Sequence, residues 1–491
     1  MTRRLFGTDG VRGVAGEMLS AELALGLGRS ATAVVAHGAG RTSDAATADR
    51  VGEAGRRPQV LIIRDTRESG EMLQAALAAG VSAAGGDALL GEVLPTPAAP
   101  LLIGRYGFDL AAVISASHNP YRDNGIKFFG ADGFKLSDET EAEIERELER
   151  SAGSATGGGD SSAGGNGGAG TPPSGERAAG SAERAASDTE HAVGRVRELR
   201  GTEEDYLREL HARFQELSLD GLDVLLDCAN GATYHVAPEI FRRLGATVHV
   251  IADAPDGRNI NAGCGSTHID ALAERVRAGG HAIGFAFDGD GDRVLAVDGD
   301  GAVVDGDELM ALAALHLKRA GRLTGGGVAV TVMTNYGFHS AMRDAGIEVA
   351  TTQVGDRYVL EALRAHGWAL GGEQSGHIIE LDFNRSGDGI ASALLVLEAL
   401  AGRPLSERDA MAKLPQRLVN VQVRDRGALA ATTVVTDAVQ AEDAALAGRG
   451  RVLVRPSGTE PLVRVMVEAP SDDEAESVCG RLVALVEREL G

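Results

Sequence analysis

Cysteine, aromatic residues and long apolar runs are all scarce in this sequence. Its 491 residues include only three cysteines, Cys228, Cys264 and Cys479, with no CxxC pair, which argues against a disulfide framework and a thiolate zinc site. The aromatic share of 4% argues against stacking platforms for bases. No stretch approaches the roughly 18 apolar residues of a membrane span, and the segment 1–9 lacks the apolar core of a targeting peptide. We therefore expect a soluble, cytoplasmic protein.

Positive charge is also in deficit. Lys and Arg number 48 against 71 Asp and Glu, giving a formal net charge of -23, a field that repels nucleic acid and anionic membranes. We therefore expect a small-molecule substrate and neither nucleic-acid nor membrane partners, and an anionic substrate would need a local basic pocket. Walker A, GxSxG and strand-to-helix GxGxxG motifs are absent, which argues against a P-loop kinase, a serine-elbow hydrolase and a dinucleotide-binding enzyme.

The remaining pattern is that of layered α/β domains. Short aliphatic runs at Val60–Ile63, Val224–Leu226 and Val328–Met333 each lead through a polar turn into an amphipathic helix, which predicts three related domains with parallel sheets. Ligands of such sheets bind beyond the carboxyl ends of the strands. The C-terminal region, with a helix from about Asp472, predicts a small α+β domain. We place the four domains at residues 1–198, 199–303, 304–412 and 413–491.

Two low-complexity segments interrupt the first domain. Between Ser151 and Glu190, 27 of 40 residues are Gly, Ser or Ala, too little apolar surface to offset the entropy of ordering, so we predict a disordered insert at 151–190. A similar segment, 36–57, predicts a surface excursion between a helix and the strand Gln59–Ile63. The insert 151–190 lies outside every motif, so we expect it to leave catalysis intact.

A serine-bearing turn follows one of the apolar runs. Ser115-Ala116-Ser117-His118-Asn119-Pro120 comes directly after Ala111–Ile114, and a strand that ends in such a turn suits a nucleophile or phosphate carrier. A polar turn whose Ser and Asn cap a helix would have the same composition. A hydrolytic Ser–His pair is less attractive, because adjacent residues rarely aim their side chains at each other.

Three aspartates alternate with glycine after another apolar run. Asp288-Gly289-Asp290-Gly291-Asp292 follows Ala282–Ala286, and its carboxylates could converge on one hard divalent cation, for which Mg²⁺ is the natural candidate. An EF-hand would need glutamate where Gly299 stands. An exposed acidic turn is the alternative, although repulsion among three clustered carboxylates is costly without a cation.

Two further polar loops could recognise a phosphosugar. The loop Gly371–His377 carries Glu, Ser and His side chains that suit hydrogen bonds to sugar hydroxyls, or it is purely structural. The sequence Arg455-Pro456-Ser457-Gly458-Thr459-Glu460-Pro461, followed by Arg464, offers backbone N–H groups, hydroxyls and guanidinium groups to phosphate. The same residues could form a plain turn between two strands.

In this order, the motifs resemble the α-D-phosphohexomutase superfamily, from Leu5 to the C-terminal helix, apart from the two low-complexity segments. Four segments are similar in sequence to the branch that acts on glucosamine phosphates: Phe6–Gly13, Ser115–Phe129, Ile260–Thr267 and Gln353–Glu361. The resemblance implies four domains around a central cleft, three α/β and a smaller, mobile last one.

The resemblance also implies roles for individual residues. Ser117 would carry the phosphoryl group, and Asp288, Asp290 and Asp292 would bind Mg²⁺ together with the phosphoserine. The other implied site residues are His118, Lys127, Arg12 and Arg293 for catalysis; Glu373, Ser375, His377, Asp356 and Arg357 for the substrate; and Arg455, Ser457, Gly458, Thr459 and Arg464 for the distant phosphate.

The implied reaction is an isomerisation between a hexosamine 6-phosphate and its 1-phosphate. Phosphoserine 117 would give its phosphoryl group to the sugar, and the resulting bisphosphate, which also serves as activator, would reorient and return the other phosphoryl group. Relatives of this kind are often dimers, so a homodimer is expected. Mannose or glucose phosphates are alternative substrates. A metal-dependent phosphatase would release free phosphate, and a phosphosugar-binding module would keep its function after Ser117→Ala.

Overall fold

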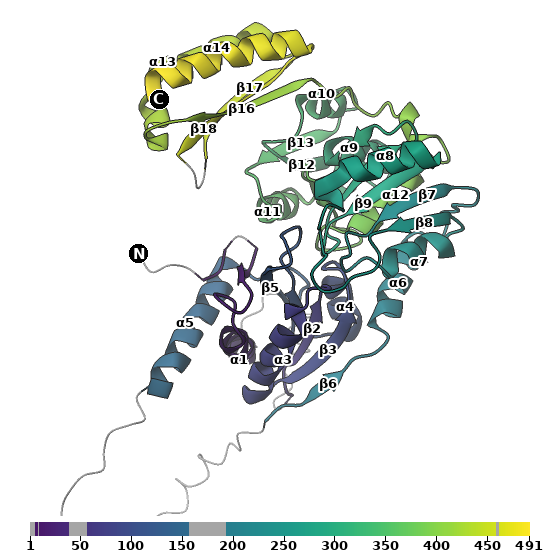
Figure 1. The fold of residues 1–491 in the computed structure, drawn as a ribbon, viewed down its shortest axis with the longest axis vertical. Helices are drawn as coiled ribbons and strands as arrows, with labels where there is room; N and C mark the ends of the chain where they lie inside the picture. Colours follow the sequence, from purple (N-terminus) through teal and green to yellow (C-terminus); the bar gives the residue numbers. More distant parts are fainter. Residues whose placement is uncertain (1–4, 8, 39–55, 157–192, 458–460) are drawn as a thin grey trace, which may run out of the picture. The chain divides into compact units, whose positions relative to one another are not determined.

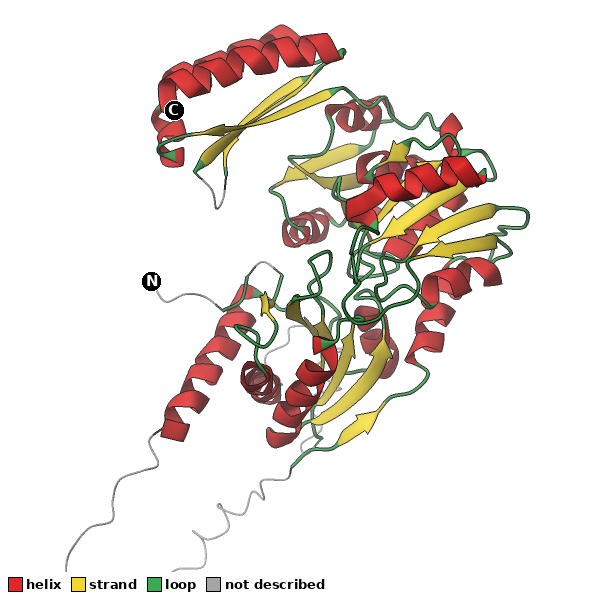
Figure 2. Ribbon diagram, in the orientation of Figure 1, coloured by secondary structure: helices red, strands yellow, loops and turns green. Residues whose placement is uncertain are grey.

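The computed structural model describes residues 5–7, 9–38, 56–156, 193–457 and 461–491. The chain forms two compact units, one of Met1–Ala212, Asn230–Val236 and Asp253–Ala262, and one of Arg213–Ala229, Ala237–Ala252 and Gly263–Gly491. Helices cover the sheets in both units (Figure 1, Figure 2). Within the described residues, no helix is both long and apolar enough to cross a membrane.

The first unit contains a six-stranded sheet of order β1-β5-β4-β2-β3-β6. Its strands are β1 Val11–Val14, β2 Gln59–Arg64, β3 Asp87–Val93, β4 Leu110–Ile114, β5 Asp123–Gly130 and β6 Val196–Glu198. Its helices are α1 Ala21–Gly38, α3 Ser69–Ala83, α4 Ala98–Tyr106, α5 Asp138–Thr156 and α6 Thr202–Arg213. The main core lies between α1, α3 and α5 and the central strands. Every residue of β4 is buried, as a continuous apolar run covered on both faces requires.

The second unit contains three sheets, of orders β11-β10-β9-β7-β8, β13-β12-β14-β15 and β16-β18-β17. The strands of the first two are β7 Asp223–Asp227, β8 Thr247–Ile251, β9 Ile283–Phe287, β10 Val294–Asp298, β11 Val303–Val304, β12 Gly327–Thr331, β13 Glu348–Thr352, β14 Leu370–Gly372 and β15 Ile378–Glu380. Their helices are α7 Val236–Arg243, α8 Ile269–Gly279, α9 Gly306–Arg319, α10 Tyr336–Asp344, α11 Asp356–His366 and α12 Gly389–Leu400, with short 3₁₀ turns η1 Ser266–His268, η2 Thr324–Gly326 and η3 Leu405–Glu407.

The third sheet belongs to the C-terminal module. Its strands are β16 Gln416–Gln422, β17 Arg451–Pro456 and β18 Leu462–Glu468, packed with η4 Arg426–Ala431, α13 Thr433–Leu446 and α14 Asp472–Leu490. All its strand pairs are antiparallel. The predicted fold class, three α/β layers followed by a smaller α+β domain, is confirmed.

Strand direction differs from the prediction of parallel sheets. The central strands are parallel, but β5, β10 and β15 run antiparallel to β4, β9 and β14. The four motif loops are therefore reversals between two paired antiparallel strands: β4 to β5, β9 to β10, β14 to β15 and β17 to β18. A short loop suffices for such a connection, whereas a parallel one needs a long crossover.

The first residues of both predicted inserts lie in helices. Helix α1 continues to Gly38 and α5 to Thr156, because residues 36–38 and 151–156 include alanines, the strongest helix formers, that prolong an existing helix. Residues 39–55 and 157–192 lie outside the described residues. The predicted boundaries between the four domains stay predictions.

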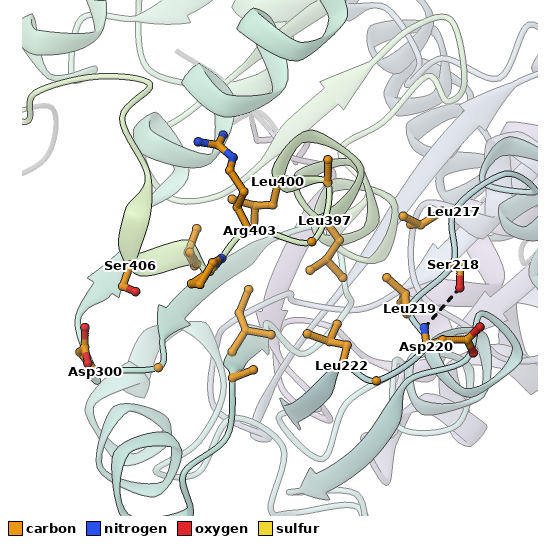
Figure 3. A pocket seen from close by; sticks show the side chains of 18 residues that line it. Leu217, Ser218, Leu219, Asp220, Leu222, Asp300, Leu397, Leu400, Arg403 and Ser406 are labelled. Carbon is orange, nitrogen blue, oxygen red and sulfur yellow. Dashed lines mark hydrogen bonds between the residues drawn. The ribbon is translucent and has the colours of Figure 1, made fainter.

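One apolar cavity of about 600 Å³ lies in the second unit, where the end of α12 meets the loop before β7. Leu217, Leu219, Leu222, Leu397 and Leu400 line it, with Arg403 at its wall (Figure 3). None of the motif residues takes part in its lining.

Candidate functional site

Ser117 is buried and its backbone is strained. Its side chain is 1% exposed and its φ is 51°, a left-handed conformation that few residues other than glycine adopt. The Ser117 hydroxyl lies 3.2 Å from Nδ1 of His118. Strain of this kind persists only where the surroundings impose it, and it concentrates at functional positions.

Two side chains impose this conformation by holding the same two carbonyl groups. Arg67 donates from Nη2 to the carbonyl oxygens of Ser117 and Asn119 at 3.1 and 2.6 Å. Asn261 donates from Nδ2 to the same oxygens at 2.9 and 3.1 Å. The serine loop is therefore fixed from two sequence-distant segments of the first unit.

A buried acid anchors this arrangement. Asp65 pairs with Arg67, and both side chains are 0% exposed. Ser115 donates its hydroxyl to Asp65 at 2.5 Å and accepts the backbone N–H of Ser117 at 3.0 Å. Asp65, Arg67 and the serine loop, residues 115–120, therefore form one network. Removing one member of its buried ion pair would leave an uncompensated charge.

A second group of charges surrounds Asp9 in the same unit. Nζ of Lys127, itself 1% exposed, lies 3.2 Å from Asp9 Oδ2, and Arg12 and Lys135 also pair with this carboxylate. Burial opposes ionisation of Asp9, but the charges of Lys127, Lys135 and Arg12 outweigh it and hold the pKa of Asp9 well below its usual range. Three cations on one carboxylate leave positive charge for an anionic ligand.

Gly10 allows the segment that carries Asp9 to lie close to Lys127 on β5. Its φ is 78°, and a Cβ there would lie 2.4 Å from the carbonyl oxygen of Ile126 on β5. No residue with a side chain could hold the N-terminal segment so close to Lys127. Arg12 follows on β1, and its Nε has no hydrogen-bond partner among the described residues.

In the second unit, the three predicted aspartates converge. Asp288 and Asp290 are 0% and Asp292 5% exposed, and their carboxylate oxygens lie within 4.8 Å of one another. Burial opposes the charge of Arg293, but Asp292, Asp288, Glu373 and Asp290 outweigh it and raise the pKa of Arg293 above its usual value. Three buried carboxylates with one neighbouring guanidinium fit a hard divalent cation with oxygen ligands.

The loop between β14 and β15 lies against this aspartate loop. The Val294 N–H donates to Gly376 O at 3.1 Å, and Gly376, with φ 89°, could not carry a Cβ, which would lie 2.0 Å from Val294 O. His377, 3% exposed, has Nε2 3.9 Å from Asp292 and 4.0 Å from Asp356. Glu373 accepts the Gly355 N–H at 3.0 Å, whereas Ser375 is exposed.

The pairing of β17 with β18 brings together two arginines. Arg455 and Arg464 are directly opposite each other in the two strands. Burial and the charge of Arg464 both lower the pKa of Arg455. Ser457, 5% exposed, donates its N–H to Leu462 O at 2.9 Å. The predicted phosphate ligands Gly458 and Thr459 lie outside the described residues.

The predicted site residues thus form separate groups. Ser117 and His118 adjoin each other, and Arg12 and Lys127 share Asp9, all in the first unit. The aspartates, Arg293, Glu373, His377 and Asp356 assemble in the second, with Arg357 at the start of α11.

Asp9, Lys135, Asp65, Arg67 and Asn261 were not predicted as site residues. Asp65 and Arg67 follow the carboxyl end of β2, a signal that could have found them. Asn261 lies in the segment Ile260–Thr267, one of those that carry the family resemblance, and this could have pointed to it.

Comparison with known proteins places the whole chain in one family. Models described as Phosphoglucomutase/phosphomannomutase match it in four successive parts: domain I at residues 3–154, domain II at 204–301, domain III at 305–418 and the C-terminal domain at 418–485.

Curated relatives match over nearly their full length. A phosphoglucosamine mutase of Moorella thermoacetica is 47% identical over 98% of this chain and 98% of its own. One of Desulforudis audaxviator is 48% identical over 98% and 97%.

Solved structures share the fold. A phosphoglucomutase/phosphomannomutase family protein of Burkholderia thailandensis has a TM-score of 0.72 at 22% identity, over 100% of this chain and 99% of its own. An Aspergillus fumigatus N-acetylphosphoglucosamine mutase, in complex with GlcNAc-6P and magnesium, has a TM-score of 0.63 at 20% identity, over 99% and 95%. The chain belongs to the phosphoglucomutase/phosphomannomutase family, the α-D-phosphohexomutases.

Proposed function

We propose that the protein is a phosphoglucosamine mutase, an isomerase that interconverts glucosamine 6-phosphate and glucosamine 1-phosphate. The observation that carries the choice of sugar is the 47–48% identity to curated phosphoglucosamine mutases over at least 97% of each chain. The observation that supports the chemistry is the strained, buried Ser117 held by Arg67 and Asn261.

The reaction begins with Ser117 phosphorylated. The bond between Ser117 Oγ and phosphorus breaks as a sugar hydroxyl oxygen bonds to the phosphorus; the hydroxyl proton passes to a general base, and a general acid protonates Oγ. The bisphosphate then turns, and its other phosphoryl group returns to Oγ. His118, 3.2 Å from Oγ, and Lys127 are the groups we assign to proton transfer.

Charge stabilisation is the larger part of phosphoryl transfer. Asp288, Asp290 and Asp292 would hold Mg²⁺ with the phosphoserine, and the ion would neutralise charge on the transferred group. Arg293 sits among these aspartates, and we assign it with Arg12 to the same phosphoryl oxygens.

Recognition of the sugar and of the idle phosphate is assigned to the other loops. Glu373, Ser375, His377, Asp356 and Arg357 would hydrogen-bond the sugar. The opposed Arg455 and Arg464, with Ser457 and the loop that includes Gly458 and Thr459, would hold whichever phosphate is not reacting, which allows one site to serve both orientations of the bisphosphate. A homodimer and a cytoplasmic location stay predictions.

The test is a side-by-side turnover assay by phosphorus NMR. Glucosamine 6-phosphate, mannose 6-phosphate and glucose 6-phosphate are each offered with Mg²⁺ and catalytic sugar bisphosphate. We expect the glucosamine 1-phosphate to form fastest, with little free phosphate. Faster turnover of mannose or glucose phosphate would make the protein a phosphomannomutase or phosphoglucomutase, and release of free phosphate alone would contradict the mutase mechanism. Ser117→Ala should abolish turnover and keep substrate binding.

A further inference from the structure

Two histidines and an aspartate form a cluster on the sheet of β7, β8 and β9, apart from the motif loops. Asp223 begins β7, His249 lies on the edge strand β8, and His281 lies two residues before β9. His281 Nδ1 is 2.5 Å from one oxygen of Asp223, and His249 Nε2 is 3.1 Å from the other. The imidazole rings are 4.6 Å apart.

The sheet fixes the relative positions of these side chains. Asp223 pairs with Thr247, and Leu225 pairs with His249; because side chains alternate along a strand, Asp223 and His249 lie on the same face. A Cβ on Gly279 would lie 2.6 Å from Nε2 of His281, so this glycine leaves the space that the ring occupies. The cluster thus rests on three neighbouring backbone segments of one unit.

The donor set differs from that of the aspartate loop. The three ligand atoms, two imidazole nitrogens and one carboxylate oxygen, lie within 4.8 Å of one another. Mixed nitrogen and oxygen ligands suit Zn²⁺ and similar transition metals, whereas Mg²⁺ favours oxygen alone. Ligand atoms of a tetrahedral Zn²⁺ site are roughly 3.3 Å apart, so three ligand atoms that already lie within 4.8 Å of one another reach that spacing with shifts of about 1.5 Å or less.

The exposure of the cluster leaves room for further ligands. The side chains of His249 and Asp223 are 48% and 41% exposed, and that of His281 is 15% exposed. Water can therefore complete a coordination sphere that has three protein ligands, as in open zinc sites. The net charge of -23 also favours the approach of a cation.

We propose that Asp223, His249 and His281 form a second metal site, specific for Zn²⁺ or a similar transition metal, that joins β7, β8 and the segment that leads into β9. On binding, each imidazole offers the metal a nitrogen lone pair; in a neutral ring the proton that this nitrogen shared with Asp223 moves to the other ring nitrogen, and a doubly protonated ring releases one proton to solvent. The site does not depend on the proposed mutase activity. Since only the folded sheet brings the three ligands together, metal binding stabilises this unit against unfolding.

The test uses the full chain, stripped of metal and then held in excess Mg²⁺ so that the aspartate loop is occupied. Zn²⁺ is titrated in competition with a chromophoric chelator. We expect one competing site in the wild type. His281→Asn and His249→Asn should each weaken it at least about 100-fold, because even outer-shell changes typically cost about 10- to 100-fold in metal affinity. Zn²⁺ should also raise the thermal unfolding midpoint of the wild type and of neither variant.

The matched control is His235→Asn. His235 is an exposed histidine beside a carboxylate, with Nδ1 3.7 Å from Glu203, and its loss should leave Zn²⁺ affinity unchanged. Turnover with Mg²⁺ should survive in all three variants, which also shows that they fold. The proposal is overturned if the wild type shows no competing site in Mg²⁺, or if the His281 and His249 variants bind Zn²⁺ as tightly as the wild type.

Discussion

Arg455 and Arg464 are directly opposed across the β17–β18 pair. Like charges in this position destabilise a sheet by up to about 1 kcal/mol, so the arrangement favours binding of an anion. We predict that Arg464→Gln raises KM for the phosphosugar about 10-fold or more, because a charge-assisted hydrogen bond contributes about 1.5–3 kcal/mol. The same change should raise the thermal unfolding midpoint of the ligand-free protein.

Arg481→Gln is the control for this prediction. Arg481 lies in the same module and pairs with Glu442, so its loss should leave KM unchanged and not stabilise the protein. If the Arg464→Gln variant is stabilised but has a normal KM, these arginines do not bind the substrate.

The left-handed backbone of Ser117 can be tested apart from its hydroxyl. Ser117→Gly and Ser117→Ala both remove the phosphate carrier, so both should be inactive. Glycine adopts positive φ without strain, whereas alanine keeps a penalty of about 1–2 kcal/mol. After the greater entropy loss of glycine is subtracted, Ser117→Gly should be the more stable variant by up to about 1 kcal/mol in thermal unfolding. Equal or reversed stability would show that the conformation carries no strain.

Asn261 should act on the rate rather than on substrate affinity. Asn261→Ala removes both hydrogen bonds to the serine loop but leaves Arg67 in place. We expect kcat to fall about 10-fold or more, because small misplacements of reacting groups lower the rate strongly. KM should stay within about twofold of the wild-type value. Arg258→Gln, an exposed change in the same segment, should alter neither constant. A raised KM with unchanged kcat would instead place Asn261 in substrate binding.

The buried aspartates should make stability depend on metal. Asp290→Asn removes one of three neighbouring negative charges, so in EDTA its unfolding midpoint should be higher than that of the wild type. In Mg²⁺ the order should reverse, because the wild type gains binding energy that the variant loses. Turnover should be lost both in EDTA and in the variant. The same order of midpoints in both buffers would argue against a metal at this loop.

Asp307 should give the second unit a pH-dependent stability. Burial, and then the charge of Asp305, raise the pKa of Asp307 to about 7. A raised carboxyl pKa stabilises the fold while the group is protonated, and this contribution is lost as pH rises from about 4 to about 7. Asp307→Asn keeps an acceptor for the Asn335 N–H and should raise the unfolding midpoint at pH 8 but not at pH 4. A similar gain at both pH values would contradict this origin.

The sequence predicted much of the local structure and less of the site. Aliphatic runs located β2, β7 and β12, and glycine-spaced aspartates located a cluster that the fold does assemble. The reversals after the first three motifs were missed, because an aliphatic run does not encode the direction of its neighbour, whereas a turn between two strands was one of the two interpretations of the fourth motif. The role of Asn261 was also missed, since its contact with Ser117 spans 144 residues and exists only once both segments have folded.

The two low-complexity segments both precede strands of the first sheet that start at the same end of that sheet. The first segment leads into β2 and the second leads toward β6. Both strands are parallel to β4, so they begin at the end of the sheet opposite the carboxyl end of β4, which Ser117 follows. At the other end of the sheet, the pairing of β4 with β5 constrains the connection that carries Ser117. We therefore predict that shortening either segment leaves the turnover rate unchanged.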